Sequence, residues 1–215
     1  MKTRVVYRPR RERGVVLLFC LIVLVILLAG GVAIIRSMNT SLASAGNLAF
    51  KRDLLNQGEA AVAQVMQSFM TGGALATSAA TASSLPSANY SAIELKTNPS
   101  GVPLVLLKKG SFVAGTDIAN GSFLPTGADI PGRIVSGTTS DVSIRYVIDR
   151  LCNTTGTFAT LGATRCVTTS TQVKGGSSQS TPLALPAPAL YRLTIRVDGP
   201  RDTQVFMQTS FTKPE

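Results

Sequence analysis

RERGVVLLFCLIVLVILLAGGVAIIR, residues 11–36, decides how the rest of this chain is organised. Between Gly14 and Arg36 it holds twenty-one residues without a single charge. At about 1.5 Å per helical residue this run reaches about 31 Å, the thickness of the hydrocarbon core of a bilayer. The sequence therefore predicts a membrane-spanning helix over residues 15–35 that begins abruptly after Gly14.

The residues before this run set its expected orientation. Six Lys or Arg residues precede it, against one acidic residue, Glu12. Basic residues beside a span favour the cytoplasm, so we expect a cytoplasmic N-terminus and a C-terminal domain across the membrane. A cleaved secretory signal is the competing interpretation, but its apolar region is about 7 to 15 residues long and ends at a small-x-small site. Here the run is longer, and Arg36-Ser37-Met38 follows it.

The net charge of +10 over 215 residues is largely a property of residues 1–14. Without them, 15 basic and 10 acidic residues remain. A mildly basic surface in water explains this excess of basic residues. The excess gives only weak support for an anionic partner such as DNA or a lipid headgroup. The length that remains after the span suits one ordinary domain.

The helix is expected to continue beyond the span. No proline interrupts residues 37–70, and apolar residues recur there on one helical face. They are Leu48, Leu55, Val62, Val65, Met66 and Phe69. Glycines at 72 and 73 would end the helix near Met70. The glycines at 30–31 and 46 leave open a kink, with a span followed by a separate amphipathic helix.

The chain after the helix is predicted to form strands and loops. Short strands are expected at 91–97 and 102–109, and clearer alternation marks 141–149. YRLTIRV at 191–197 and TQVFMQTSF at 203–211 predict a hairpin with one face on a core and the other, with its arginines, in water. An amphipathic helix needs an apolar surface to lie on, so the predicted fold class is α+β, a long N-terminal helix on an antiparallel sheet.

The three cysteines differ in setting. Cys20 lies inside the apolar run, where a lone thiol acts as a small apolar side chain. Cys152 and Cys166 bracket thirteen residues on the side of the membrane opposite the basic leader. In an oxidising compartment a disulfide between them would stabilise the fold by about 3 kcal/mol. Two unpaired buried thiols are the alternative.

Little in the sequence points to catalysis. The chain has no histidine, which excludes His-dependent triads, HExxH sites and most zinc sites, and its cysteines lack metal-ligand spacing. No glycine motif for phosphate is present, and the carboxylates are scattered singly. We therefore expect no enzyme, no metal site and no cofactor, although distant carboxylates could still meet in space.

A basic leader ending in Gly14, an abrupt apolar helix and an α+β domain together resemble type IV pilins and the related pseudopilins. Residues 14–64 and YRLTIRVDGPRDTQVFMQ at 191–208 are similar to the minor pilins of the PilX family, as is the loop between the last two cysteines. The resemblance covers about 70 residues at the two ends of the chain. It implies four parts, which are a cleaved leader over 1–14, the transmembrane and amphipathic halves of the helix over 15–35 and 36–70, and a periplasmic pilin domain over 71–215.

What the resemblance implies concerns processing and assembly. A prepilin peptidase would cut between Gly14 and Val15 and methylate the new N-terminus at Val15. The protein would wait in the bacterial inner membrane and then join other minor pilins, the major pilin and the inner-membrane assembly machinery in an extracellular pilus. Its expected function is to help initiate the fibre, with roles in twitching motility or surface attachment. DNA binding has weak support.

One residue departs from the family pattern. Most pilins have glutamate five residues after the cleaved glycine, taken to pair with the N-terminal amine of a neighbouring subunit, whereas this chain has Phe19. Phe19 cannot form that ion pair, so we expect a subunit at or near the fibre tip. Simple drift at this position is the alternative.

Two other interpretations of the whole chain remain. A pseudopilin of a type II secretion system would share the N-terminus and the missing glutamate. A signal-anchored periplasmic enzyme would share only the apolar helix. The identity of the N-terminal residue of the mature protein separates the enzyme from the two pilin-like alternatives.

Overall fold

The computed structural model describes residues 14–132, 142–169, 188–200 and 202–213 of the 215. The predicted leader, except Gly14, therefore lies outside the described residues. The chain divides into two compact units, Met1–Phe50 and Lys51–Glu215. The helix α1, Val15–Met66, begins in the first unit and ends in the second.

In the first unit, α1 begins at Val15, directly after Gly14, and continues without a break through Gly30, Gly31 and Gly46. This confirms one helix rather than two. The side chains of residues 15–35 are all exposed. The most apolar 18-residue window of the helix has a mean hydropathy of 3.3, so α1 is long and apolar enough to cross a membrane.

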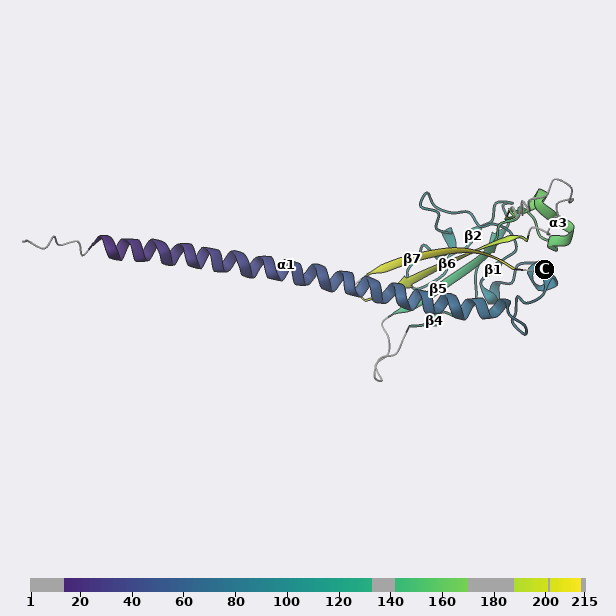
Figure 1. The fold of residues 1–215 in the computed structure, drawn as a ribbon. Helices are drawn as coiled ribbons and strands as arrows, with labels where there is room; N and C mark the ends of the chain where they lie inside the picture. Colours follow the sequence, from purple (N-terminus) through teal and green to yellow (C-terminus); the bar gives the residue numbers. More distant parts are fainter. Residues whose placement is uncertain (1–13, 133–141, 170–187, 201, 214–215) are drawn as a thin grey trace, which may run out of the picture. The chain divides into compact units, whose positions relative to one another are not determined.

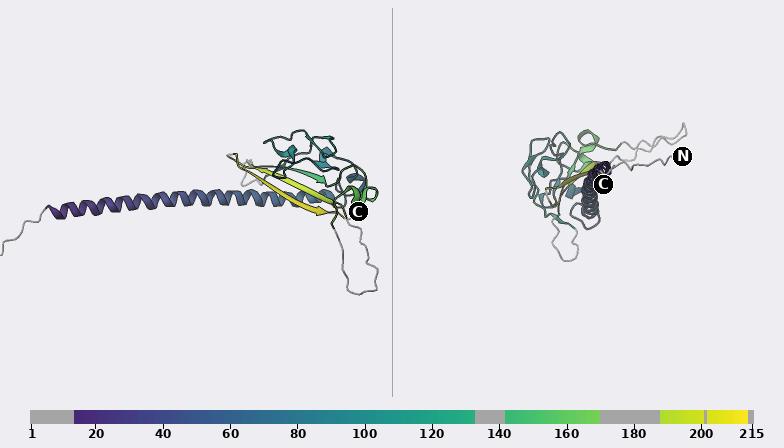
Figure 2. Two further views of the ribbon diagram at one scale, coloured as in Figure 1. Left: turned by 90° about the horizontal axis from the view of Figure 1, so that it is seen from above. Right: turned by 90° about the vertical axis from the view of Figure 1, so that its left-hand side faces the viewer.

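In the second unit, the last turns of α1 pack on a β-sheet (Figures 1 and 2). Its buried residues are spaced four, three and four apart, the spacing of one helical face. They are Leu54, Gly58, Ala61 and Val65. A Cβ added to Gly58 would collide with the sulfur of Met207 and lie 3.2 Å from Val197, so the absent side chain lets helix and sheet approach closely. A 3₁₀ turn, η1 (Gln67–Phe69), follows α1.

The sheet has the strand order β1-β5-β6-β7, with β4 also paired to β5. The strands are β1 (Tyr90–Ser91), β4 (Ile130–Pro131), β5 (Ser143–Arg150), β6 (Leu190–Asp198) and β7 (Gln204–Thr212). All these pairs are antiparallel except β1 with β5. The predicted α+β class and the C-terminal hairpin are therefore confirmed. A separate pair joins β2 (Gly115–Thr116) and β3 (Ser122–Phe123).

One face of the sheet meets α1 through the apolar residues that the alternation predicted. Tyr191, Leu193, Ile195 and Val197 of β6 are all buried. Near the end of the helix, the ring centroid of Phe69 lies 5.5 Å from that of Tyr191 and 5.0 Å from that of Phe211, both edge-on. Aromatic pairs in this arrangement add to the stability that area burial gives.

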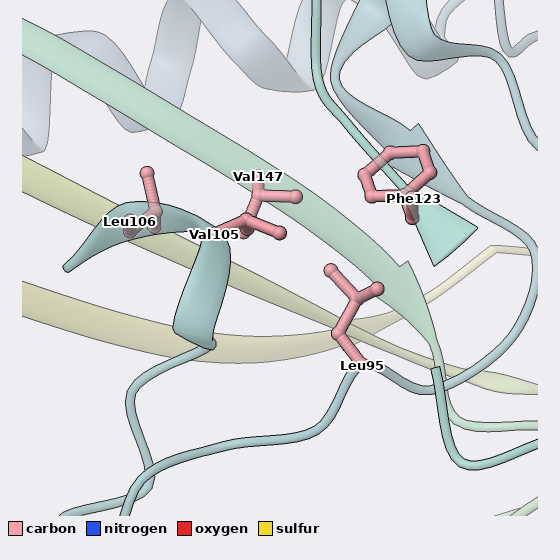
Figure 3. Packing of buried hydrophobic residues seen from close by; sticks show 5 residues of the cluster. All are labelled: Leu95, Val105, Leu106, Phe123 and Val147. Carbon is pink, nitrogen blue, oxygen red and sulfur yellow. The ribbon is translucent and has the colours of Figure 1, made fainter. Parts of the chain in front are cut away.

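The second face of the sheet is buried too, and here the prediction of a face in water is wrong. Arg145 is 1 % exposed and Arg196 is 2 % exposed. Residues 92–125, which we call the covering segment, lie over this face. A small apolar cluster joins it to β5, as Figure 3 shows, through Leu95, Val105, Leu106, Phe123 and Val147.

The predicted strands before residue 110 are mostly absent. Only Tyr90–Ser91 forms a strand near the expected 91–97, and the predicted strand at 102–109 contains instead a 3₁₀ turn, η3 (Leu104–Leu106). The carbonyls of Leu106, Leu107 and Lys108 accept hydrogen bonds from arginine side chains rather than from a neighbouring strand. Apolar alternation alone could not reveal this.

Two short helices and a 3₁₀ turn lie in segments without a predicted element. They are α2 (Ser78–Thr81), η2 (Pro86–Ala88) and α3 (Phe158–Arg165). The side chain of Thr77 caps α2 by accepting from the Ala80 amide at 3.2 Å. The helix α3 occupies most of the loop between Cys152 and Cys166.

Candidate functional site

The predicted processing site lies at the first turn of α1. Gly14 is an exposed turn residue, Val15 is the first helical residue, and the Gly14 carbonyl accepts from the Leu18 amide at 3.4 Å. Gly14 has open space around its α-carbon, with no heavy atom within 4 Å of an added Cβ. The Gly14–Val15 peptide bond therefore lies at a boundary between turn and helix, and no side chain of the described residues packs against the Gly14 α-carbon.

Phe19 lies on the exposed surface of the same helix, one turn from Val15. Its side chain is 67 % exposed, and the apolar residues around it are similarly uncovered. An exposed apolar helix of this length needs either lipid or other helices to cover it. Phe19 presents an apolar ring to the lipid or helix that covers it, whereas a glutamate at this position would present a carboxylate for an ion pair.

The buried face of the sheet carries an unpredicted ionic cluster, which we call the arginine clamp and which consists of Arg145, Arg192 and Arg196. Arg145 and Arg196 lie directly opposite each other on β5 and β6. The Asp198 carboxylate accepts hydrogen bonds from both arginines, and the bond from the Arg196 Nε is 2.8 Å long. One carboxylate therefore offsets two like charges that would otherwise repel across the strands.

The same arginines hold the backbone of the covering segment. Arg196 Nη1 donates to the carbonyls of Leu106 at 2.8 Å and Leu107 at 2.6 Å. Arg145 Nη1 donates to the Lys108 carbonyl at 2.9 Å. A guanidinium group has five donors in a rigid fork, which suits simultaneous bonds to a carboxylate and to carbonyls. The clamp thus satisfies backbone groups that no neighbouring strand reaches.

Arg192 repeats this arrangement at the other end of the face. It lies opposite Asp149, pairs with that carboxylate, and donates to the Leu95 carbonyl at 3.1 Å. Asp149 also accepts from the Leu95 amide at 3.0 Å. Burial raises the pKa of Asp149, while the hydrogen bonds from Arg192 act in the opposite direction.

Asp129, Tyr146 and Asp202 also have shifted pKa values. Burial raises the pKa of Asp129, although the nearby Arg145 charge opposes the shift. Burial also raises the pKa of Tyr146, against a hydrogen bond with Asn89. The exposed Asp202 has a lowered pKa because Lys109 hydrogen-bonds it. Asp129 lies 3.9 Å from the Arg145 Nε, so it extends the clamp toward the surface.

Cys152 and Cys166 are joined by a disulfide, as the sequence predicted for an oxidising compartment. Both are buried, and a hollow of about 280 Å³ lies beside them. The Glu94 amide donates to the Cys152 carbonyl at 3.0 Å, so the disulfide loop is tied to the covering segment. Cys20 is a free, exposed cysteine within the apolar part of α1.

A second hollow, of about 320 Å³, lies between α1 and the β4 side of the sheet. Its helical wall is polar, with Asp53, Gln57 and Gln64, and its other wall is apolar, with Ile130 and Ile144. The Gln57 Nε2 donates to the Asp53 carboxylate at 2.8 Å. Among the described residues, no group of three His, Cys, Asp or Glu side chains gathers as metal ligands.

The predicted site residues belong to different compact units. Gly14, Val15 and Phe19 belong to the first unit, and the disulfide belongs to the second. The sequence contained a partial signal for the clamp, because arginines and aspartates alternate with apolar residues in β5 and β6. Which arginine meets which aspartate depends on strand register, which was not predicted.

Comparisons with known proteins add no relationship to these observations. No protein-family profile, no curated protein and no solved structure matches the chain.

Proposed function

We propose that the chain is a minor pilin of a type IV pilus, of the PilX kind, which helps initiate the fibre and is located at or near its tip. The observation that carries the proposal is the helix α1. It starts at the residue after Gly14, exposes an uninterrupted apolar run over residues 15–35, and packs its last turns on a mostly antiparallel sheet. A subunit that moves from a bilayer into a helical fibre needs one helical segment that is apolar on its exposed surface and another that packs on its own domain.

The proposed path has three steps. The basic leader holds the N-terminus in the cytoplasm, and the apolar half of α1 anchors the chain in the inner membrane with its globular domain in the periplasm. A prepilin peptidase then cuts after Gly14 and methylates Val15. Finally, the exposed apolar helix leaves the bilayer and packs against the helices of other minor pilins and the major pilin, with the inner-membrane assembly machinery.

The disulfide agrees with the proposed compartment. Disulfides persist in oxidising spaces such as the periplasm and the cell exterior and are rare in the cytosol. Cys152 and Cys166 would face that space in the proposed orientation. A role in DNA uptake has only the weak support of a mildly basic chain, and surface attachment has no located residue.

The mass of the mature N-terminus tests the processing step. We expect membrane and sheared-fibre fractions to contain a chain that begins at N-methylated Val15. A Gly14→Leu variant should keep its leader and remain in the membrane fraction. An intact Met1 in both fractions of the unmodified chain would contradict the proposal, and would favour the signal-anchored enzyme.

Phe19 tests the tip position. A glutamate placed there by Phe19→Glu would have no neighbouring amine at a tip, and an unpaired carboxylate in apolar surroundings costs several kcal/mol. We expect fewer fibres with Phe19→Glu and unchanged fibre number with the apolar control Phe19→Leu. Tolerance of the glutamate, with immunogold label spread along the shaft, would indicate drift at this position and not a tip role.

Deletion of the gene that encodes this chain distinguishes a pilus subunit from a subunit of a type II secretion system. We expect loss of surface fibres and twitching, with release of secreted enzymes unchanged. The reverse result would assign the chain to the pseudopilins, which share the helix and the missing glutamate.

A further inference from the structure

The strand β7 is an open edge of the sheet. It pairs with β6 over nine consecutive residues, from Leu190 opposite Thr212 to Asp198 opposite Gln204, without a bulge. In the described part of the chain, no other strand pairs with it and no turn or loop bonds to its backbone. Its outward N–H and C=O groups are therefore available to another polypeptide.

This edge lacks the features by which proteins usually prevent edge pairing. Its sequence, QVFMQTSFT, has no charged residue, no proline and no glycine. Natural edge strands are commonly short, bulged, or protected by lysine and proline. A regular, uncharged edge of nine residues is thus a template for one more strand.

A partly uncovered apolar strip lies beside this edge on α1 and on the turn η1 that follows it. The residues of the strip are Leu55, Val62, Met66 and Phe69. They lie roughly a quarter of a turn around the helix from its buried row. The polar residues that line the hollow near β4 lie on the other side of that row. The apolar strip therefore faces β7, since Phe69 contacts Phe211 and Gly58 abuts Met207. Leu55 is 38 % exposed, and the others are half-buried.

We propose that β7 and this helical strip together form a docking site for an extended strand of another protein. The strand would pair with the β7 backbone and lay every second side chain over the strip between Leu55 and Phe69. Because the edge and the strip carry no charge, the matching strand is uncharged, with apolar residues at alternate positions. A helical partner would leave the β7 backbone unpaired, so the edge selects a strand.

This docking site does not rest on the pilus proposal, because it uses only the sheet and the end of α1. It also differs from the hollow beside the disulfide, which offers no unpaired strand. The partner identified by this chemistry is a β-forming segment and not a nucleic acid or a lipid.

A peptide-binding experiment on the full chain in detergent micelles tests the site. The probe is a fluorescent nine-residue peptide in which valine and threonine alternate, so it is uncharged and differs from β7 itself, and its control is the same peptide with every backbone nitrogen methylated. We expect saturable binding of the first peptide, read by anisotropy, and none of the second. Equal binding of both peptides, or no binding of either, would overturn the proposal.

Two lysine substitutions locate the binding. Thr209→Lys charges the exposed edge of β7, and Leu55→Lys charges the strip, where a buried unpaired ammonium is costly. We expect each to weaken binding by at least about tenfold. Asn56→Lys, on the other flank of α1, should change it by less than about twofold. If Thr209→Lys does not fold, Ser210→Lys charges the same edge.

The outcomes separate the possible occupants. Equal weakening by Asn56→Lys would show nonspecific binding and overturn the site. A chain that forms a dimer in micelles, and loses it with Thr209→Lys, would show that a second copy occupies the edge, which contradicts the assigned partner. A monomer that binds the peptide at β7 supports the proposal.

Discussion

Removing the charge of Asp198 should destabilise the second unit severely. In an Asp198→Asn variant, Arg145 and Arg196 stay buried and opposite each other, and their shared carboxylate is gone. Breaking a buried ion pair by removing one partner costs about 3–5 kcal/mol. Asp129 lies near Arg145, but it is half-exposed and only partly offsets that charge.

That cost is large compared with the free energy of unfolding of a typical domain, about 5–15 kcal/mol. For a unit of this size, 1 kcal/mol changes the melting temperature by about 2–4 °C, so we expect a decrease of about 6–20 °C. The assay is near-ultraviolet circular dichroism of the full chain in detergent during heating. The control is Asp202→Asn, which breaks the exposed pair with Lys109 and should leave the melting temperature unchanged.

Limited trypsin digestion gives a second measurement. Arg145 donates to the Lys108 carbonyl, and this carbonyl belongs to the peptide bond that trypsin would cut. Without Asp198, the arginine clamp should hold the covering segment less tightly, and cleavage after Lys108 should accelerate. Melting temperatures within 2 °C of each other for the unmodified chain and Asp198→Asn, with equal cleavage rates, would refute the reasoning.

Two further predictions concern the disulfide and the approach of helix to sheet. Replacing both Cys152 and Cys166 with serine should lower the free energy of unfolding by about 3 kcal/mol, measured as a reduced melting temperature, because a loop of this length is no longer closed; no change would mean that the loop is ordered without its crosslink. Gly58→Leu should cost about 1–3 kcal/mol because the new side chain meets Met207 and Val197, whereas Gly46→Ala, with open space around it, should be neutral or slightly stabilising. Equal stability of the two glycine variants would show that α1 does not approach the sheet closely at Gly58.

Local patterns in the sequence determined the long elements. The uncharged run after Gly14 and the helical spacing up to Phe69 predicted α1 within a few residues of its observed end. Alternating apolar residues predicted β5, β6 and β7 in the same way. These patterns are local, since a helix or strand needs only a few neighbouring residues to show its period.

Tertiary structure alone decided the second face of the sheet. Alternating arginines are the expected pattern for a face in water, and nothing near Arg196 in the sequence indicates that the Leu106 carbonyl, ninety residues away, will cover it. Backbone carbonyls are the same at every residue, so a segment held through them leaves no side-chain pattern. The pairing of Asp149 with Arg192 depends likewise on register between distant strands. The sequence by itself determined which residues alternate, and the covering segment decided that the charged ones are buried.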